Sequence, residues 1–250
     1  MIRTSLLALA LCLATGCTRA PTPVVAPPQA AAATPAPAGP PCLAAVIHDL
    51  QQQWPGNATV NIVAFGHSVP AGYGTTPQVQ KRDAYPRLLE DALANAYPYA
   101  VLNVITAGVG GENSTQGRAR FQRDALDHHP RVVLIDYGLN DRALPLAEST
   151  ANLEKMIEAS RAAGACPVLL TPTWDEQADP QRSDDTLAQQ ATMIRQLGHD
   201  AQVPVADSLA AFQAYPGDRA ALMAQFNHPN RQGHQLVLER LLPLFLPTPP

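Results

Sequence analysis

Five short apolar runs, each followed by a segment long enough for a helix, constrain the fold of this chain more than any other feature. The runs are rich in β-branched residues and almost continuously hydrophobic, which is typical of strands buried on both faces of a parallel sheet. They cover residues 60–65, 100–105, 132–137, 168–171 and 203–206. The alternation predicts a three-layer α/β/α sandwich, doubly wound on five parallel strands with right-handed crossovers.

The segments between the runs have the length and the apolar spacing of amphipathic helices. Leu88, Leu89, Ala92 and Leu93, for example, lie on one face of a helix. Helices are expected over residues 83–96, 114–127, 147–163, 184–198 and 230–242, the last ended by a proline.

The first 16 residues are typical of a secretory signal peptide. Arg3 supplies a positive charge, residues 5–14 are nearly all apolar, and small residues follow. The apolar stretch is too short to span a bilayer as a lasting helix. The sequence therefore predicts an exported protein.

Cys17 directly follows these small residues, and the segment resembles the lipobox of bacterial lipoproteins. The resemblance implies that Cys17 is lipidated and becomes the mature N-terminus. Ala14 stands where leucine is usual, so a plain secreted protein is the alternative. Thr18 is not acidic, which favours the outer membrane, facing the periplasm, in a cell that has one.

Residues 17–42 are expected to form a linker between this anchor and a single folded domain over residues 43–247. Eight of the 24 residues from 18 to 41 are proline and eight are alanine, a composition that builds no core and stays extended. The remaining 205 or so residues are long enough for one domain with a substantial core.

The charge of the chain bears on nucleic-acid and membrane binding, and its cysteines bear on disulfide and metal sites. The formal net charge is −4, and Lys and Arg are scattered without a basic stripe, so no nucleic acid is expected. A membrane is expected to be contacted only through the lipid anchor. Cys42 and Cys166 either pair as a disulfide in an oxidising envelope or stay free. No cysteine has the spacing of a metal ligand.

Polar and glycine-rich segments follow several predicted strands, at the sheet edge where open α/β folds bind ligands. The first contains Ser68 between glycines, directly after the first strand. The four segments are residues 66–72, 107–114, 138–141 and 227–234.

Together the four segments resemble the ordered blocks of the SGNH hydrolases, the GDSL-type esterases and lipases. The resemblance covers residues 60–240 and implies a flavodoxin-like sheet and hydrolysis of an acyl ester through an acyl-serine, without a metal or organic cofactor. By this resemblance Ser68 is the nucleophile and His228 is the base. Ser68, Gly111 and Asn140 form the oxyanion hole.

The chemistry of these residues agrees with the carried-over roles. A serine hydroxyl needs a neighbouring imidazole to take its proton. The negative oxygen of the tetrahedral intermediate needs preorganised donors, and the backbone N–H groups of Ser68 and Gly111 with the amide of Asn140 are suitable.

Two positions depart from the family pattern. His67 stands where an aspartate usually precedes the serine, and we expect it to pack and hydrogen-bond rather than to take part in catalysis. Gln225 stands where an aspartate usually orients the histidine. A glutamine carbonyl can accept from the imidazole N–H but supplies no charge. We therefore expect a dyad of Ser68 and His228, assisted by Gln225 or by a main-chain carbonyl.

Gly-His-Ser also begins the nucleophile elbow of α/β-hydrolases, Gly-x-Ser-x-Gly. The fifth residue here is Pro70, and no predicted strand precedes the one before Ser68, which disfavours that class. Asp141 is expected to hold the loop of Asn140. The polar loop over residues 175–184 is long enough to have a function and is expected to influence specificity.

The sequence thus predicts an exported serine esterase, lipid-anchored through Cys17. Short-chain esters of the O-acetyl type, on carbohydrate or cell-envelope glycan, are the expected substrates. The alternatives are a lipase or acyl-thioesterase for longer chains, and a catalytically degenerate lipoprotein that binds glycan.

Overall fold

The structure of the chain is a computed structural model that describes residues 41–182 and 184–247. The expected signal peptide over residues 1–16, Cys17 and nearly all of the expected linker lie outside the described residues. Among the described residues, no helix is long and apolar enough to cross a membrane.

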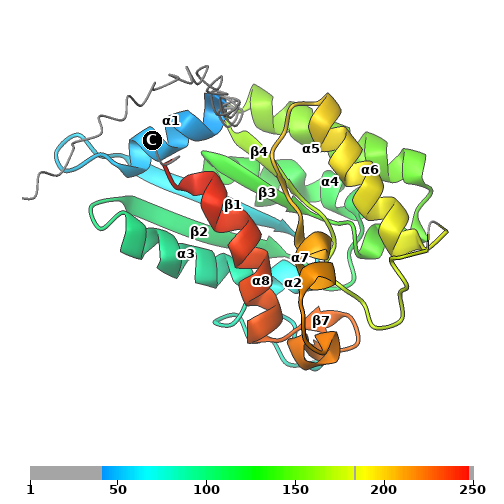
Figure 1. Cartoon of the computed structure of the whole chain (residues 1–250). Helices are drawn as coiled ribbons and strands as arrows, with labels where there is room; N and C mark the ends of the chain where they lie inside the picture. The colour runs from blue at the N-terminus through cyan, green and yellow to red at the C-terminus, as the bar shows by residue number, and fades with distance from the viewer. Residues whose placement is uncertain (1–40, 183, 248–250) are drawn as a thin grey trace, which may run out of the picture. The chain divides into compact units, whose positions relative to one another are not determined.

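A sheet of five parallel strands forms the centre of the fold, in the order β2-β1-β3-β4-β5 (Figure 1). The strands are β1 (Thr59–Gly66), β2 (Val101–Gly108), β3 (Val132–Asp136), β4 (Cys166–Leu170) and β5 (Val205–Ala206). The register aligns Gly66 with both Gly108 and Asp136, so the carboxyl ends of β1, β2 and β3 meet at one edge. The predicted five-stranded parallel sheet is confirmed.

In the part of the chain that the structure describes, helices occupy the five places where the sequence predicts them, and three more helices occur elsewhere. The eight are α1 (Pro41–Leu50), α2 (Ser68–Ala71), α3 (Tyr85–Ala96), α4 (Ser114–Asp124), α5 (Leu146–Ala162), α6 (Thr186–Asp200), α7 (Ser208–Ala214) and α8 (Arg231–Leu241). Short 3-10 turns cover Leu126–His128, Asn140–Ala143, Arg219–Leu222 and Leu242–Phe245, and β6 (Met223–Gln225) pairs antiparallel with β7 (His228–Pro229). The helices α1, α2 and α7 and the β6-β7 pair were not predicted.

Alternating side chains of the strands fill two apolar cores, one on each face of the sheet. In β1, Ile62 and Ala64 pack with residues of α1, α3 and α8, whereas Val63 and Phe65 pack with residues of α4, α5 and α6. Figure 1 shows α8 crossing in front of the sheet. Burial on both faces explains why the strands read as continuous apolar runs, and it makes the sheet a firm base for the loops at its carboxyl edge.

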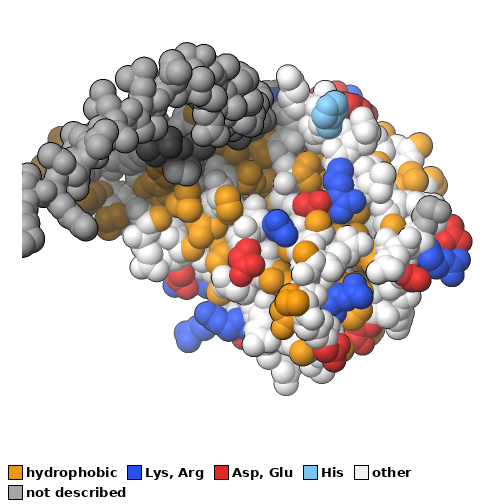
Figure 2. Space-filling view, viewed as in Figure 1, with side chains coloured by type: hydrophobic (Ala, Val, Ile, Leu, Met, Phe, Trp, Pro, Cys, Tyr) orange, Lys and Arg blue, Asp and Glu red, His pale blue; other side chains and the backbone are white. Residues whose placement is uncertain are grey.

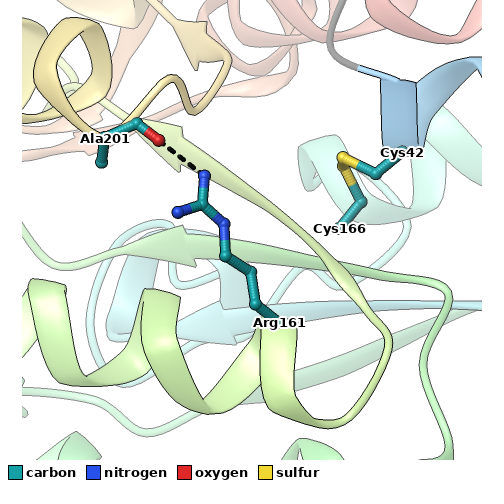
Figure 3. Close-up of a disulfide and its surroundings, with 4 residues drawn as sticks. All are labelled: Cys42, Arg161, Cys166 and Ala201. Atoms are coloured by element: carbon teal, nitrogen blue, oxygen red, sulfur yellow. Dashed lines mark hydrogen bonds between the residues drawn. A yellow bond between two sulfur atoms is a disulfide. The ribbon is translucent and has the colours of Figure 1, made fainter.

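A disulfide joins the first helix to the sheet (Figure 3). Cys42 lies in α1 and Cys166 is the first residue of β4, with their Cα atoms 5.5 Å apart. The pairing that the sequence left open is therefore formed. Since α1 begins at Pro41 and packs against the domain, the ordered fold starts two residues before the expected boundary at residue 43.

Charged side chains of both signs are interspersed over the face drawn in Figure 2. Ion pairs among the described residues include Arg231 with Asp83 at 2.9 Å and Arg195 with Asp207 at 2.7 Å. The visible face shows no continuous stripe of one sign.

Removing the disulfide by the double substitution Cys42→Ser and Cys166→Ser should lower the free energy of unfolding by about 2–4 kcal/mol. The expected cause is the loop-closure entropy of a crosslink between residues 124 apart in sequence. Chemical denaturation of both proteins measures the difference, with reduced wild-type protein as the matched control. Equal unfolding midpoints for all three samples would contradict the expectation.

Candidate active site

Ser68 stands at the tight turn from β1 into α2 and is 6% exposed. The turn requires two glycines. A Cβ on Gly66 would lie 2.3 Å from the carbonyl oxygen of Asp136, and one on Gly108 would lie 2.6 Å from that of His67. Only glycine allows such close approach of backbone to backbone. The glycines thus let the ends of three strands converge around the serine.

His228 contacts Ser68 from the opposite end of the chain. Its Nε2 lies 2.9 Å from Ser68 Oγ, and its Nδ1 lies 3.0 Å from the carbonyl oxygen of Gly74. A carbonyl oxygen only accepts, so the Gly74 contact assigns the proton to Nδ1 and leaves Nε2 as an acceptor for the hydroxyl of Ser68. This is the tautomer that a general base for serine requires.

Gln225 does not orient His228 directly. This corrects the first of the two expectations, that Gln225 or a main-chain carbonyl orients the histidine. Its Oε1 accepts a hydrogen bond of 2.9 Å from the backbone N–H of Thr76. One residue earlier, the hydroxyl of Thr75 donates to the carbonyl of Ala224 at 3.0 Å. Gln225 therefore attaches to β6 the loop that contains Gly74, and the main-chain carbonyl, the second expectation, takes the orienting place.

Burial lowers the pKa of His228 below its usual value of 6.5, and the neighbouring His67 lowers it further. The hydrogen bond to Gly74 acts in the opposite direction and raises the pKa. The net direction is downward, so the imidazole is neutral at pH 7 and free to accept a proton.

The proposed oxyanion donors lie on the loops that follow β1, β2 and β3. Gly111 has a φ of +76°, a conformation that favours glycine. Among the described residues, no acceptor takes the backbone N–H of Ser68 or of Gly111. The side-chain amide of Asn140 donates 2.9 Å to the carbonyl of Glu112, which joins the third loop to the second. One N–H of that amide remains for a further acceptor.

A buried cluster around Arg120 of α4, which no sequence pattern predicted, supports these loops. The guanidinium donates to the carbonyls of Gly66 and Ala107 at 3.0 Å each and forms an ion pair with the carboxylate of Glu112. The hydroxyl of Tyr137 donates to the same carboxylate at 2.8 Å. Arg120 thus ties the ends of β1 and β2 to the loop of Gly111.

Asp141 holds the start of α4, in line with the loop-holding role expected for it. It accepts a hydrogen bond of 2.7 Å from the backbone N–H of Ser114 and one of 2.6 Å from the hydroxyl of Ser149. Burial raises its pKa, and the hydrogen bonds from both serines act against that rise. The side chain fixes the Asn140 turn to the neighbouring helices.

The loop over residues 175–184 reaches the turn beside His228. Asp175 forms an ion pair of 2.7 Å with Arg142, and the N–H of Glu176 donates 2.8 Å to the carbonyl of Phe226. Phe226, two residues before the histidine, is 39% exposed. In the described part of the chain, no group of three or more His, Cys, Asp or Glu is arranged to hold a metal ion.

Residues 64–236 match the model of the GDSL-like Lipase/Acylhydrolase family. The match covers more than half of the chain. The chain belongs to this family. The resemblance inferred from the four sequence blocks is thereby confirmed.

Curated relatives of this GDSL-like protein include two that match at about one third identity. An uncharacterized lipoprotein, YqeF, of Bacillus subtilis is 32% identical over 46% of this chain and 49% of its own length. An arylesterase of Vibrio mimicus is 33% identical over 45% of this chain and 54% of its own length. The chain thus spans about half the length of these two relatives. An acetylxylan esterase of Geobacillus stearothermophilus is 24% identical over 73% of this chain and 89% of its own length.

Solved structures show the same fold. The acetylxylan esterase of Geobacillus stearothermophilus superposes with a TM-score of 0.64 at 22% identity, over 74% of this chain and 94% of that one. A lipase/acylhydrolase of Enterococcus faecalis superposes with a TM-score of 0.62 at 26% identity and the same coverage. The α/β fold predicted from the sequence is that of these hydrolases.

Proposed function

We propose that the protein is a serine esterase that removes short acyl groups, of the O-acetyl type, from carbohydrate or cell-envelope glycan. The observation that carries the proposal is the 2.9 Å contact between Ser68 Oγ and Nε2 of His228. The other ring nitrogen of His228, Nδ1, is held by the carbonyl of Gly74. Membership of the GDSL-like family supports hydrolysis of an ester. The acetylxylan esterase relative, 89% of which aligns, supports an acetylated carbohydrate.

In the acylation half of the reaction, Ser68 Oγ attacks the ester carbonyl carbon while Nε2 of His228 takes the hydroxyl proton. The carbonyl π electrons move to the oxygen, which becomes an oxyanion. The N–H groups of Ser68 and Gly111 and the amide of Asn140 donate to that oxygen. Each such donor is worth about 10²–10³ in rate.

Collapse of the tetrahedral intermediate breaks the bond to the alcohol, which leaves with the proton from His228. Water then attacks the acyl-serine and gives its proton to the same nitrogen. Expulsion of Ser68 Oγ, reprotonated by His228, releases the carboxylic acid. The tautomer set by Gly74 is restored at the end of the cycle.

The proposed location is the cell envelope, with the domain held by a lipid on Cys17. The small residues before Cys17 support export and lipidation, and one relative carries the name lipoprotein. The proline- and alanine-rich segment before the domain is long enough to separate the catalytic domain from a membrane surface.

Ser68→Ala should lower kcat on p-nitrophenyl acetate by about 10³-fold or more, because the attacking atom is removed. Steady-state kinetics on acetate, octanoate and longer esters, and acetate release from acetylated xylo-oligosaccharide, measure the activity and its chain-length preference. Ser208→Ala is the matched control, since Ser208 Oγ has no hydrogen-bond partner among the described residues.

The proposal requires serine-dependent turnover that is faster on acetate than on octanoate. Faster turnover of octanoate and longer esters would favour the lipase or thioesterase instead. Folded wild-type protein without turnover of any ester would exclude the esterase and favour a lipoprotein that only binds glycan.

Cys17→Ser should move the protein from the membrane fraction to the soluble fraction of its cell envelope, because the thioether to the lipid cannot form. Fractionation followed by immunoblotting measures the distribution, with Cys12→Ser as a matched control within the signal peptide. Retention of the Cys17→Ser protein in the membrane fraction would contradict a lipid anchor at this residue.

A further inference from the structure

His67, the residue before the nucleophile, is fully buried and contacts the Ser68 hydroxyl itself. Its Nδ1 lies 3.4 Å from Ser68 Oγ and accepts a hydrogen bond of 3.3 Å from the backbone N–H of Val69. Because Nδ1 accepts this N–H, the neutral imidazole carries its proton on Nε2. Two imidazole nitrogens thus lie within reach of one serine hydroxyl, that of His228 at 2.9 Å and that of His67 at 3.4 Å.

The Nε2 of His67 faces a buried carboxylate. It lies 3.5 Å from Oδ1 of Asp136, a contact that lacks the alignment of a hydrogen bond. Asp136 is 3% exposed, and its Oδ2 accepts a hydrogen bond of 3.2 Å from the hydroxyl of Tyr85. Burial and the adjacent Asp136 raise the pKa of Tyr85 well above its usual value, so Tyr85 remains protonated as a donor.

The two histidines differ in what supports them. His228 is held by the carbonyl of Gly74, which selects a tautomer but supplies no negative charge. His67 has the carboxylate of Asp136, which can stabilise an imidazolium as the aspartate of a catalytic triad does. Among the described residues of this site, Asp136 is the buried acid that lies beside an imidazole, and that imidazole is the one of His67 and not of His228.

Other groups also lie near His67. The ring of Tyr137 lies 6.4 Å from the ring of His67. Burial has the largest effect on the pKa of Asp141 and on that of His228, and the interaction with His67 lowers both.

We propose that His67 and Asp136 form a second proton-accepting pair for Ser68, subordinate to His228. The proposal rests on the proposed function, since it assigns a further role in activating the same nucleophile. His228 is the better acceptor, because its nitrogen is closer to Oγ and bonds no N–H, whereas protonation of His67 Nδ1 displaces the hydrogen bond from Val69.

In the proposed step, Ser68 Oγ forms a bond to the electrophilic atom while its proton passes to Nδ1 of His67. The carboxylate of Asp136 stabilises the resulting imidazolium through Nε2. With an ester, the carbonyl π pair moves to oxygen. The proton returns to the alkoxide oxygen when the bond to the alcohol breaks. With a fluorophosphonate, the P–F bond breaks and fluoride leaves.

The test measures the rate at which a small alkyl fluorophosphonate labels Ser68 of the full chain, by mass spectrometry of the intact protein. This reaction reports nucleophile activation without the need for a natural substrate. His228→Ala should slow labelling by about 10²-fold or more yet leave it measurable. Adding His67→Asn should lower the remaining rate by about tenfold or more. The asparagine amide oxygen can still accept from Val69 but cannot take a proton.

Asp136→Asn in the His228→Ala background should give a similar further loss, because it removes the charge and retains the shape. His129→Asn in the same background is the matched control and should change nothing, since His129 is exposed and its φ of +49° suits asparagine. Thermal unfolding identifies variants that fail to fold. If the His67→Asn variant fails to fold, the labelling rate of the Asp136→Asn variant tests the second pair instead.

Two results would overturn the second pair. In the first, neither His67→Asn nor Asp136→Asn changes the labelling rate of the His228→Ala protein by more than about twofold. In the second, the His228→Ala protein is labelled no faster than Ser68→Ala. Failure of the proposed function looks different. Ser68 would then be labelled at a rate that depends on both histidines, while no ester is turned over.

Discussion

The hydrogen-bonded chain from the Gly74 carbonyl through His228 to Ser68 is the interaction on which the rest of this site depends. It joins residues 154 and 160 positions apart with contacts of 3.0 and 2.9 Å. A carbonyl can orient an imidazole only if the loop that bears it is fixed. That loop is attached to β6 by Gln225 and Thr75, so a residue in the place of the usual acid still serves the histidine indirectly.

The buried charges of the site lie behind the reacting groups. Asp136 lies next to His67 and accepts from Tyr85, while the Arg120–Glu112 pair crosslinks the strand ends and the Gly111 loop. A buried ion pair with satisfied hydrogen bonds gives rigidity more than net stability. In this protein the Arg120–Glu112 pair therefore positions loops, and His228, the proposed base, is supported by the neutral carbonyl of Gly74.

The fold was predictable from the sequence because a strand buried on both faces must be apolar along its length, as residues 60–65 are. Ser68 and His228 were found by their side chains within recognisable blocks. A main-chain carbonyl was one of the two orienting groups expected for His228. The sequence did not identify Gly74 as its source, because a main-chain carbonyl has no sequence signature and Gly74 is distant along the chain. Arg120 was missed for a related reason, since three of its acceptors, Gly66, Ala107 and Tyr137, come together only in the folded sheet.

The most direct measurement of the central claim is a ¹⁵N NMR titration of the histidine side chains, with His228 identified by the signal lost in His228→Ala. At pH 7 the imidazole of His228 should be neutral, with its proton on Nδ1 and an unprotonated Nε2. The midpoint of its titration should lie below the usual pKa of 6.5, because burial disfavours the charged form. A proton on Nε2 in the neutral form, or a midpoint above that value, would contradict the account.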